Sequence, residues 1–249
     1  MKNNNELNFK VLLYLKAKKH GIELNNNVLE KFEIYKNLLI EWNEKINLTS
    51  ITDEYQIIEK HFVDCLECIK YINENDSIID VGTGAGFPGI VIAIYFENKV
   101  NITLLDALNK RLLYIEEVIK KLDLKNVNIV HGRAEDMANN TNYREKYDIS
   151  IARAVAPLNI LSEYTSPYIK INGKCILMKG DNIQEEIDKC KNAFSTLNLQ
   201  IKNKYNYSLE IEENGEVETF SRCILELKKI KNTPKNYPRS YSKIKKIPL

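Results

Sequence analysis

Apolar side chains recur every three or four residues over much of the first 75 residues, which is the spacing of a helix with one buried face. A first helix is expected from about Leu7 to Lys19, with Gly21 in the position of a C-cap that ends it. Asp53 is the expected N-cap of a later helix. The apolar stripes of the two further helices are Val28, Phe32, Tyr35, Leu39 and Trp42, and then Ile58, Phe62, Leu66, Ile69 and Ile72. Residues 1–75 are therefore predicted to form a helical cap.

From residue 77 onward the pattern changes to short β-rich runs that alternate with helical stretches. This alternation predicts a parallel sheet with helices on both of its faces. The expected strands are 77–81, 101–105, 127–130, 148–152 and 173–179, and the expected helices are 88–96, 109–122, 157–164 and 182–197.

Two more β-like runs, 199–208 and 217–227, flank Asn214-Gly215. This dipeptide is typical of tight hairpin turns, so the last two strands should be antiparallel. The sequence thus predicts an α/β fold with a mostly parallel seven-stranded sheet, formed by residues 76–227.

The formal net charge of +2 hides an uneven distribution along the chain. Residues 228–249 hold eight basic side chains and no acidic one, whereas the rest of the chain has 28 basic against 34 acidic residues. A basic strip on an acidic body indicates a polyanionic partner such as a nucleic acid. Residues 228–249 are therefore interpreted as a basic C-terminal tail on one structural unit. The alternative is a solvated end that contributes nothing to binding.

Several features of the sequence point to the cytoplasm. The N-terminus MKNNNELNFK lacks the apolar stretch of a signal peptide, and the longest apolar run, Ile90–Phe96, has only seven residues. Five cysteines, an odd number, suggest reduced thiols. Cys65 and Cys68 have the spacing of metal ligands, but no second pair follows. We therefore expect buried small side chains there and no metal site.

Four of the nine glycines lie within eight residues, at positions 82, 84, 86 and 89, between a predicted strand and a predicted helix. Glycines in this setting let the backbone approach a nucleotide closely. Asp106 ends the next strand, 20 residues after Gly86, where a carboxylate suits the hydroxyls of a ribose. The turn therefore predicts a nucleoside-containing ligand.

Asp80 helps to decide which ligand this is. Gly84-x-Gly86-x-x-Gly89 also matches the dinucleotide fingerprint, which leaves an NAD(P)-dependent oxidoreductase as the alternative. A carboxylate just before the turn would repel a pyrophosphate, whereas it favours the cationic sulfonium and ammonium groups of S-adenosyl-L-methionine (SAM). SAM is therefore the preferred cofactor.

Charged side chains also follow three further strands. Glu135 and Asp136 come after the third strand, where an acid suits the amino group of an adenine, although a helix cap is the alternative. Arg153 ends the fourth strand in an apolar segment and should face an anion or a base. Lys179 ends the fifth strand, either at the site or as a solvated loop residue.

Taken in order, these motifs resemble those of the RsmG (GidB) family of bacterial 16S ribosomal RNA guanine-N7 methyltransferases. The resemblance covers nearly the whole chain, and departs from the family's common residues at Cys65 and Ala107, where a serine is frequent. The segments that carry it are Trp42–Thr49, His61–Asp64, Asp80–Gly89, Leu105–Arg111, Gly132–Asp136, Ala152–Leu158 and Tyr237–Arg239.

The resemblance implies the class I SAM-dependent methyltransferase fold, which is Rossmann-like. It also implies methyl transfer from SAM to N7 of a guanine in the 530 loop of 16S ribosomal RNA. The expected partner is 16S ribosomal RNA or the small ribosomal subunit, and the chain is expected to be a monomer. With the analysis of the turn, the resemblance gives ten expected cofactor-binding residues: Asp80, Gly82, Gly84, Phe87, Leu105, Asp106, Ala107, Ala134, Glu135 and Arg153.

Guanine N7 has a free lone pair, so such an enzyme needs correct placement of its substrates more than a strong base. The expected catalytic residues are Arg153, to orient the guanine or hold the SAM carboxylate, with His61 and Asp64 from the helical cap. Asn47 is a further candidate, although its pattern also fits turn or cap chemistry. The alternative interpretation of His61 and Asp64 is a local structural pair with no part in catalysis.

The basic tail is expected to hold the RNA, with Tyr237 and Tyr241 available for stacking. Truncation after Glu226 should then weaken RNA binding and leave SAM binding nearly intact. A protein that binds RNA during ribosome assembly without catalysis is the remaining alternative.

Overall fold

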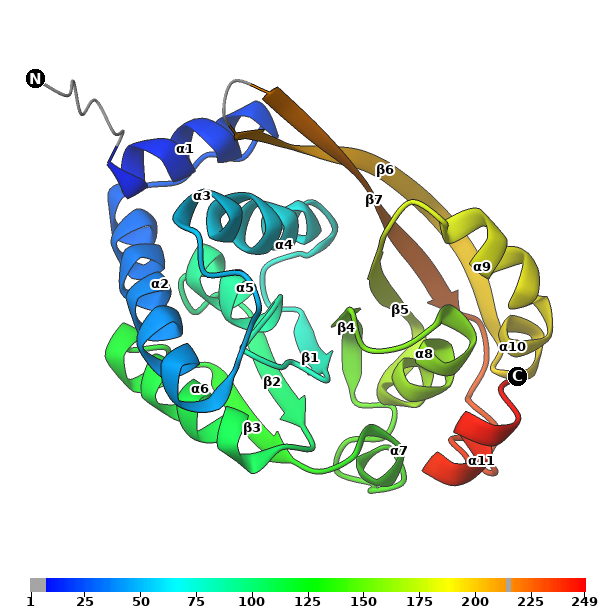
Figure 1. Ribbon diagram of the computed structural model, residues 1–249. Helices are drawn as coiled ribbons and strands as arrows, with labels where there is room; N and C mark the ends of the chain where they lie inside the picture. Colours follow the sequence, from blue (N-terminus) through cyan, green and yellow to red (C-terminus); the bar gives the residue numbers. More distant parts are fainter. Residues whose placement is uncertain (1–7, 214–215) are drawn as a thin grey trace, which may run out of the picture.

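The computed structural model describes residues 8–213 and 216–249, and its centre is one seven-stranded sheet in the order β3-β2-β1-β4-β5-β7-β6 (Figure 1). The first five strands are parallel, and β7 runs antiparallel to both β5 and β6. The strands are β1 Ser77–Val81, β2 Asn101–Asp106, β3 Val127–His131, β4 Tyr147–Arg153, β5 Ile169–Lys179, β6 Leu199–Glu213 and β7 Glu216–Lys229. The predicted fold and the antiparallel last pair are confirmed. The Asn214-Gly215 turn lies outside the described residues.

Helices cover both faces of the sheet, as predicted (Figure 1). Successive residues of a strand point to opposite faces, so Ile78 and Ile79 enter different apolar clusters. The helices after the first strand are α5 Gly89–Phe96, α6 Asn109–Leu122, α7 Ala134–Met137, α8 Leu158–Thr165, the 3-10 turn η3 Ser166–Tyr168, α9 Ile183–Lys189 and α10 Lys191–Thr196. The single helix expected over 182–197 is two helices separated at Cys190.

The helical cap is α1 Phe9–Lys19 and α2 Asn26–Ile46, followed by a third helical segment whose geometry changes along its length. That segment begins after the Asp53 N-cap, whose carboxylate accepts a hydrogen bond from the Gln56 amide at 2.9 Å. It consists of α3 Glu54–Ile57, the π-helix η1 Ile58–Val63, α4 Asp64–Leu66 and the 3-10 helix η2 Glu67–Tyr71. π-helical turns are frequent at functional sites, and η1 contains His61.

The segment predicted to be a basic tail is folded, and the expected boundary between residues 227 and 228 falls inside β7. Lys229 is fully buried, where its ammonium donates to Glu145 Oε1 at 2.7 Å and to the Ile169 carbonyl at 2.8 Å. Arg144 donates to the Thr233 and Tyr237 carbonyls, both at 2.9 Å. These contacts tie residues 228–249 to the rest of the one structural unit, through acids and carbonyls that lie 60 or more residues earlier in the chain.

All five cysteines are buried and free, and among them Cys65 and Cys68 have no exposed surface. Burial raises the pKa of the Cys65 and Cys68 thiols. Their placement confirms the expected buried small side chains. Within residues 8–213 and 216–249, no three potential metal-ligating side chains come together, and no helix there is long and apolar enough to cross a membrane.

Candidate functional site

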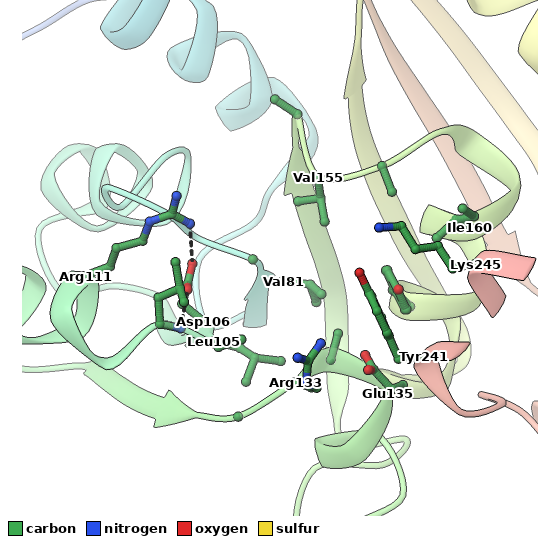
Figure 2. A pocket seen from close by; sticks show the side chains of 18 of the residues that line it. Val81, Leu105, Asp106, Arg111, Arg133, Glu135, Val155, Ile160, Tyr241 and Lys245 are labelled. Carbon is green, nitrogen blue, oxygen red and sulfur yellow. Dashed lines mark hydrogen bonds and ion pairs between the residues drawn. The ribbon is translucent and has the colours of Figure 1, made fainter. Parts of the chain in front are cut away.

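A cavity of about 460 Å³ opens where β1, β2, β3 and β4 end (Figure 2). This is the edge of a doubly wound sheet at which ligands bind. Six of the expected cofactor-binding residues line it: Gly82, Leu105, Asp106, Ala107, Ala134 and Glu135. The structure thus brings these six residues to one wall, and their contact with a cofactor remains a prediction.

The glycine turn forms the floor of the cavity at Gly82. Its amide and that of Thr83 both donate to the Leu105 carbonyl, at 2.8 and 3.0 Å, which ties the turn to β2. Gly82 has φ +74°, and a Cβ atom there would lie 2.9 Å from Val155 Cγ2. A side chain at this position would meet both backbone strain and a steric clash, so the close packing of two loops requires glycine.

Asp80 is fully buried beneath the turn and does not line the cavity within the described chain. Its Oδ2 atom accepts hydrogen bonds from Thr83 Oγ1 at 2.6 Å and from the Gly89 amide at 2.9 Å. Burial raises the pKa of Asp80 to about 6. In this structure Asp80 joins the two ends of the turn, and its expected contact with the cofactor remains a prediction.

Asp106 stands on the β2 side of the cavity with both carboxylate oxygens engaged (Figure 2). Oδ2 accepts from the Gly84 amide at 2.9 Å, and Oδ1 accepts from the Leu108 amide at 2.8 Å. Gly84 therefore contacts the Asp106 carboxylate, but it is not among the described residues that line the cavity. Charge-assisted hydrogen bonds of this kind hold the carboxylate in one orientation.

Glu135, on α7, is the cavity residue that points most directly to a ligand. It is only 4% exposed, burial raises its pKa, and its Oε1 atom has no hydrogen-bond partner among the described residues. Buried acceptors are normally satisfied, so this oxygen fits a donor such as an adenine amino group. Together with Asp106 for a ribose, the residues present fit SAM.

Several residues of this cavity were not expected from the sequence. Arg133 and Tyr164 contribute to its wall, and so do Tyr241 and Lys245 from the C-terminal helix α11 Tyr241–Lys246 (Figure 2). The sequence instead predicts RNA stacking for Tyr241 and RNA binding for Lys245. Nothing in a basic, lysine-rich segment indicates that it returns to a strand edge formed 100 residues earlier.

A second cavity of about 400 Å³ adjoins the first, and Ala154 lines both. Ala154 follows β4 and has φ +56°, in the left-handed region that a non-glycine residue seldom adopts. Such backbone strain is concentrated at functional sites. The second cavity also contains His61, Asp64 and Arg153, so the structure brings together three of the four expected catalytic residues.

Arg153 is the centre of this group and lies outside the first cavity as described. Its Nη1 atom donates to the Lys60 carbonyl at 2.7 Å and to Asp64 Oδ2 at 3.0 Å. Its Nη2 atom lies 3.1 Å from His61 Nδ1. Phe87 lies beneath these groups, 4.9 Å from the guanidinium, and is likewise outside the first cavity's lining.

His61 is held neutral with a defined tautomer. An arginine only donates, so His61 Nδ1 must accept, and the ring proton is therefore on Nε2, 2.9 Å from Thr49 Oγ1. Burial first, and the Arg153 charge second, lower the pKa of His61 to about 3. Both ring nitrogens are engaged with protein groups, which makes His61 a positioning residue in this structure.

Asn47 lies apart from both cavities as described. It is exposed, has φ +47° and caps the end of α2, where its amide donates to the Asn43 carbonyl at 3.2 Å. This geometry matches the cap chemistry named as the alternative. A catalytic role for Asn47 has no contact to support it here.

Two partners of Asp64 were missed by the sequence analysis. Tyr207 on β6 donates its hydroxyl to Asp64 Oδ1 at 2.7 Å, and Arg222 Nε on β7 lies 3.8 Å from the same oxygen. The two residues belong to the antiparallel hairpin, more than 140 positions from Asp64. No local motif marks them.

The rim of the second cavity is basic. Lys60 places its ammonium 4.2 Å from the centre of the Phe220 ring, and Arg222 lies near the same ring. Lys179, the expected cation after β5, is paired with Glu186 Oε2 at 2.7 Å. Phe220 is not among the described residues that line the cavity, but a cation–aromatic pair beside it suits a nucleic acid strand.

Comparisons with known proteins agree on one family. The family model described as "GidB: rRNA small subunit methyltransferase G" matches residues 28–213. The chain is 47% identical to "Ribosomal RNA small subunit methyltransferase G" of Clostridium perfringens (strain 13 / Type A), over 92% of this chain and 94% of that protein. It is 42% identical to the protein of the same name from Alkaliphilus metalliredigens, again over 92% of this chain and 94% of the relative.

Solved structures show the same fold at low sequence identity. A putative methyltransferase from Thermoplasma acidophilum has a TM-score of 0.52 at 14% identity, covering 65% of this chain and 71% of that one. TYW2 of M. jannaschii, solved in complex with AdoMet, has a TM-score of 0.51 at 18% identity, covering 67% and 77%. These similarities support the class I SAM-dependent methyltransferase fold.

Proposed function

The chain belongs to the GidB family, rRNA small subunit methyltransferase G, and from this premise we propose that it methylates N7 of a guanine in the 530 loop of 16S ribosomal RNA. The protein is a SAM-dependent methyltransferase of small-subunit ribosomal RNA. The observation that carries the proposal is the pair of adjoining cavities that share Ala154. One offers Asp106 and the unsatisfied Glu135 to an adenosine, and the other offers Arg153 under a basic rim.

The reaction requires alignment and no proton removal. SAM supplies, when bound, a methyl group on a cationic sulfur. With SAM bound, the N7 lone pair would form the new N–C bond, and the sulfur would keep the electron pair of the broken S–C bond, so no proton would have to leave. The positive charge moves to the guanine ring. The environment of His61 supports this chemistry, since its low pKa and engaged nitrogens leave it no role as a base.

Arg153 is the proposed guanine-orienting residue. Three of its hydrogen bonds go to Lys60, His61 and Asp64, whereas a guanidinium has five N–H groups. The remaining N–H groups can donate to guanine O6, next to the N7 atom on the same edge of the base. Asp64, Tyr207 and His61 then hold the guanidinium in position.

The sequence left two alternative functions open, and membership of the family argues against both of them. An NAD(P)-dependent oxidoreductase is not supported, because the relatives that cover more than nine-tenths of the chain carry a methyltransferase name. A non-catalytic RNA-binding protein would have lost its cofactor groups. Here Gly82, Asp106 and Glu135 together form a cavity wall.

We also propose that the protein acts as a monomer in the cytoplasm. Five buried, unpaired thiols fit a reducing compartment. Light scattering on the purified protein would report its mass in solution, and a dimer would contradict the first part.

The test of the function uses small subunits from cells that lack the gene. Incubation with the purified protein and methyl-labelled SAM should place label in 16S RNA, and chemical cleavage at 7-methylguanosine should map it to the 530 loop. Label elsewhere in the RNA would keep the methyltransferase and reject the proposed position. Absence of label with subunits and with naked RNA would reject the activity.

A further inference from the structure

The C-terminal helix α11 is held at the sheet edge by one residue just before it and by one residue within it. Arg239 binds the fully buried Glu163, with its amide 2.7 Å from Oε1 and its Nη2 2.6 Å from Oε2. Ile244, in the middle of α11, has no exposed surface. The helix therefore has a defined position and can contribute to a site.

Two side chains of α11 reach the first cavity from the side opposite Asp106 (Figure 2). Tyr241 and Lys245 are one helical turn apart, which puts them on the same face. The Arg133 guanidinium lies 4.7 Å from the centre of the Tyr241 ring, and the Lys245 ammonium lies 5.4 Å from it. Two cations thus hold one aromatic ring at the wall.

Tyr241 is also an aromatic residue with unused surface. It is 39% exposed although its helix is packed through Ile244. The unsatisfied Glu135 oxygen belongs to the same cavity, so an apolar flat surface and a buried acceptor are available together. A purine with an amino group matches both.

We propose that α11 is part of the cofactor site and that Tyr241 forms the wall against which the adenine of SAM packs. Arg133 and Lys245 hold the Tyr241 ring in place. This inference rests on the proposed function, since it concerns the cofactor of that reaction. It assigns a cofactor role to a segment whose charge suggests RNA. Lys243 and Lys246 on the same helix are exposed and do not line the described cavity, which leaves them free for other partners.

The experiment compares SAM and S-adenosylhomocysteine binding by calorimetry for the full chain and for Tyr241→Ala, Tyr241→Phe and Lys243→Ala. Tyr241→Ala should weaken both ligands about tenfold and to the same extent, because the adenosine is common to them. Tyr241→Phe keeps the ring and should change either affinity by less than about threefold. Lys243→Ala is the matched control on the same helix and should bind both ligands as the unmodified chain does.

Folding is checked by the melting temperature without ligand, which should be nearly unchanged for Tyr241→Ala because the side chain is partly exposed. A second variant, truncated after Ser240, should also lose SAM affinity while it keeps the Arg239 contacts to Glu163. If the unmodified chain binds SAM and Tyr241→Ala binds it equally well, the inference is wrong and the proposed function stands. If the unmodified chain binds no SAM, the proposed function itself fails.

Discussion

The two cavities share the loop after β4, yet they are assembled from the chain in different ways. The first cavity, which is the proposed cofactor cavity, is formed mainly by the turns that directly follow β1, β2, β3 and β4. The second cavity joins η1 of the helical cap to the end of β4 and to the distant strand β7. Parallel strands bring their carboxyl ends to one edge in any such fold, whereas the second cavity depends on how the cap and the hairpin pack. The first should therefore tolerate changes in the second, and the following experiments test that independence.

The largest effect is expected from Arg153→Ala. This variant removes the guanidinium that is proposed to donate to the substrate guanine, so kcat should fall by about 10²–10³-fold. The Kd for SAM should change by less than about threefold, because Arg153 does not line the cofactor cavity as described. Single-turnover methylation and calorimetry measure the two quantities.

Arg222→Ala is the control for Arg153→Ala. It removes a guanidinium 3.8 Å from the Asp64 carboxylate and leaves the closer ion pair between Arg153 and Asp64 intact. It should lower kcat much less. A parallel rise of more than tenfold in the SAM Kd of Arg153→Ala would join the two cavities functionally, and would restore the cofactor role expected from the sequence.

The next effect concerns the floor of the cofactor cavity. Gly82→Ala combines a positive φ with a contact of 2.9 Å to Val155, so the turn must shift. If the two loops must separate to relieve it, backbone strain of about 1–3 kcal/mol converts to a rise of roughly 5- to 150-fold in the SAM Kd. Calorimetry measures the change.

Gly21→Ala is the matched control for this variant. Gly21 has φ +73°, and a Cβ atom added there would meet no described atom within 4 Å, so the substitution adds strain and no clash. It should destabilise the fold by about 1 kcal/mol and leave SAM binding unchanged. Equal SAM affinity in Gly82→Ala and Gly21→Ala would remove the turn from the cofactor site.

The two regions should respond to acid in opposite directions. The pKa of His61 falls from 6.5 to about 3 on folding, so the unfolded chain binds a proton between these values that the folded protein does not. Stability from this residue is therefore lost as the pH falls through 6.5. The pKa of Asp80 rises from 3.8 to about 6, so the folded protein binds the extra proton, and stability increases as the pH falls through 6.

Between pH 7 and pH 5, the free energy of unfolding should fall by about 2 kcal/mol through His61 and rise by about 1 kcal/mol through Asp80. His61→Gln should make the free energy of unfolding less sensitive to acid, and Asp80→Asn should make it more sensitive. Urea unfolding at the two pH values measures both variants. The same shift in both would show that the two buried groups do not titrate as described.

The smallest effect is expected from Tyr207→Phe, which removes one hydroxyl from the far side of Asp64. Loss of this hydrogen bond should loosen the Arg153 position and lower kcat about three- to tenfold, with the SAM Kd unchanged. Tyr205→Phe on the same strand is the control, because its hydroxyl bonds Glu226 at 3.2 Å. Equal kcat values for the two variants would exclude Tyr207 as a positioning residue.

The fold could be predicted because its signals are local. Alternating apolar runs indicated the parallel strands, and glycine spacing located the turn above Leu105. The change from α-helix to π-helix at Ile58 could not be predicted, since the apolar stripe continues through it with ordinary helical spacing. In the folded chain the Lys60 carbonyl and the His61 ring of η1 both bond Arg153, a partner 92 or more positions away that no local pattern indicates.

The sequence by itself determined the order of strands and helices along the chain, the glycine turn and the residue types at each strand end, because each depends on neighbours within about 20 positions. Only the tertiary structure decided that Asp80 turns inward, that Tyr207 completes the Arg153 group, and that the basic C-terminal segment folds. The physical reason is that the ion-pair partner of a charged side chain can lie far away in the sequence, and only folding brings the two together. Glu145 and Glu163 bind Lys229 and Arg239 across 84 and 76 positions, and so hold in place a segment whose Tyr241 and Lys245 line the first cavity.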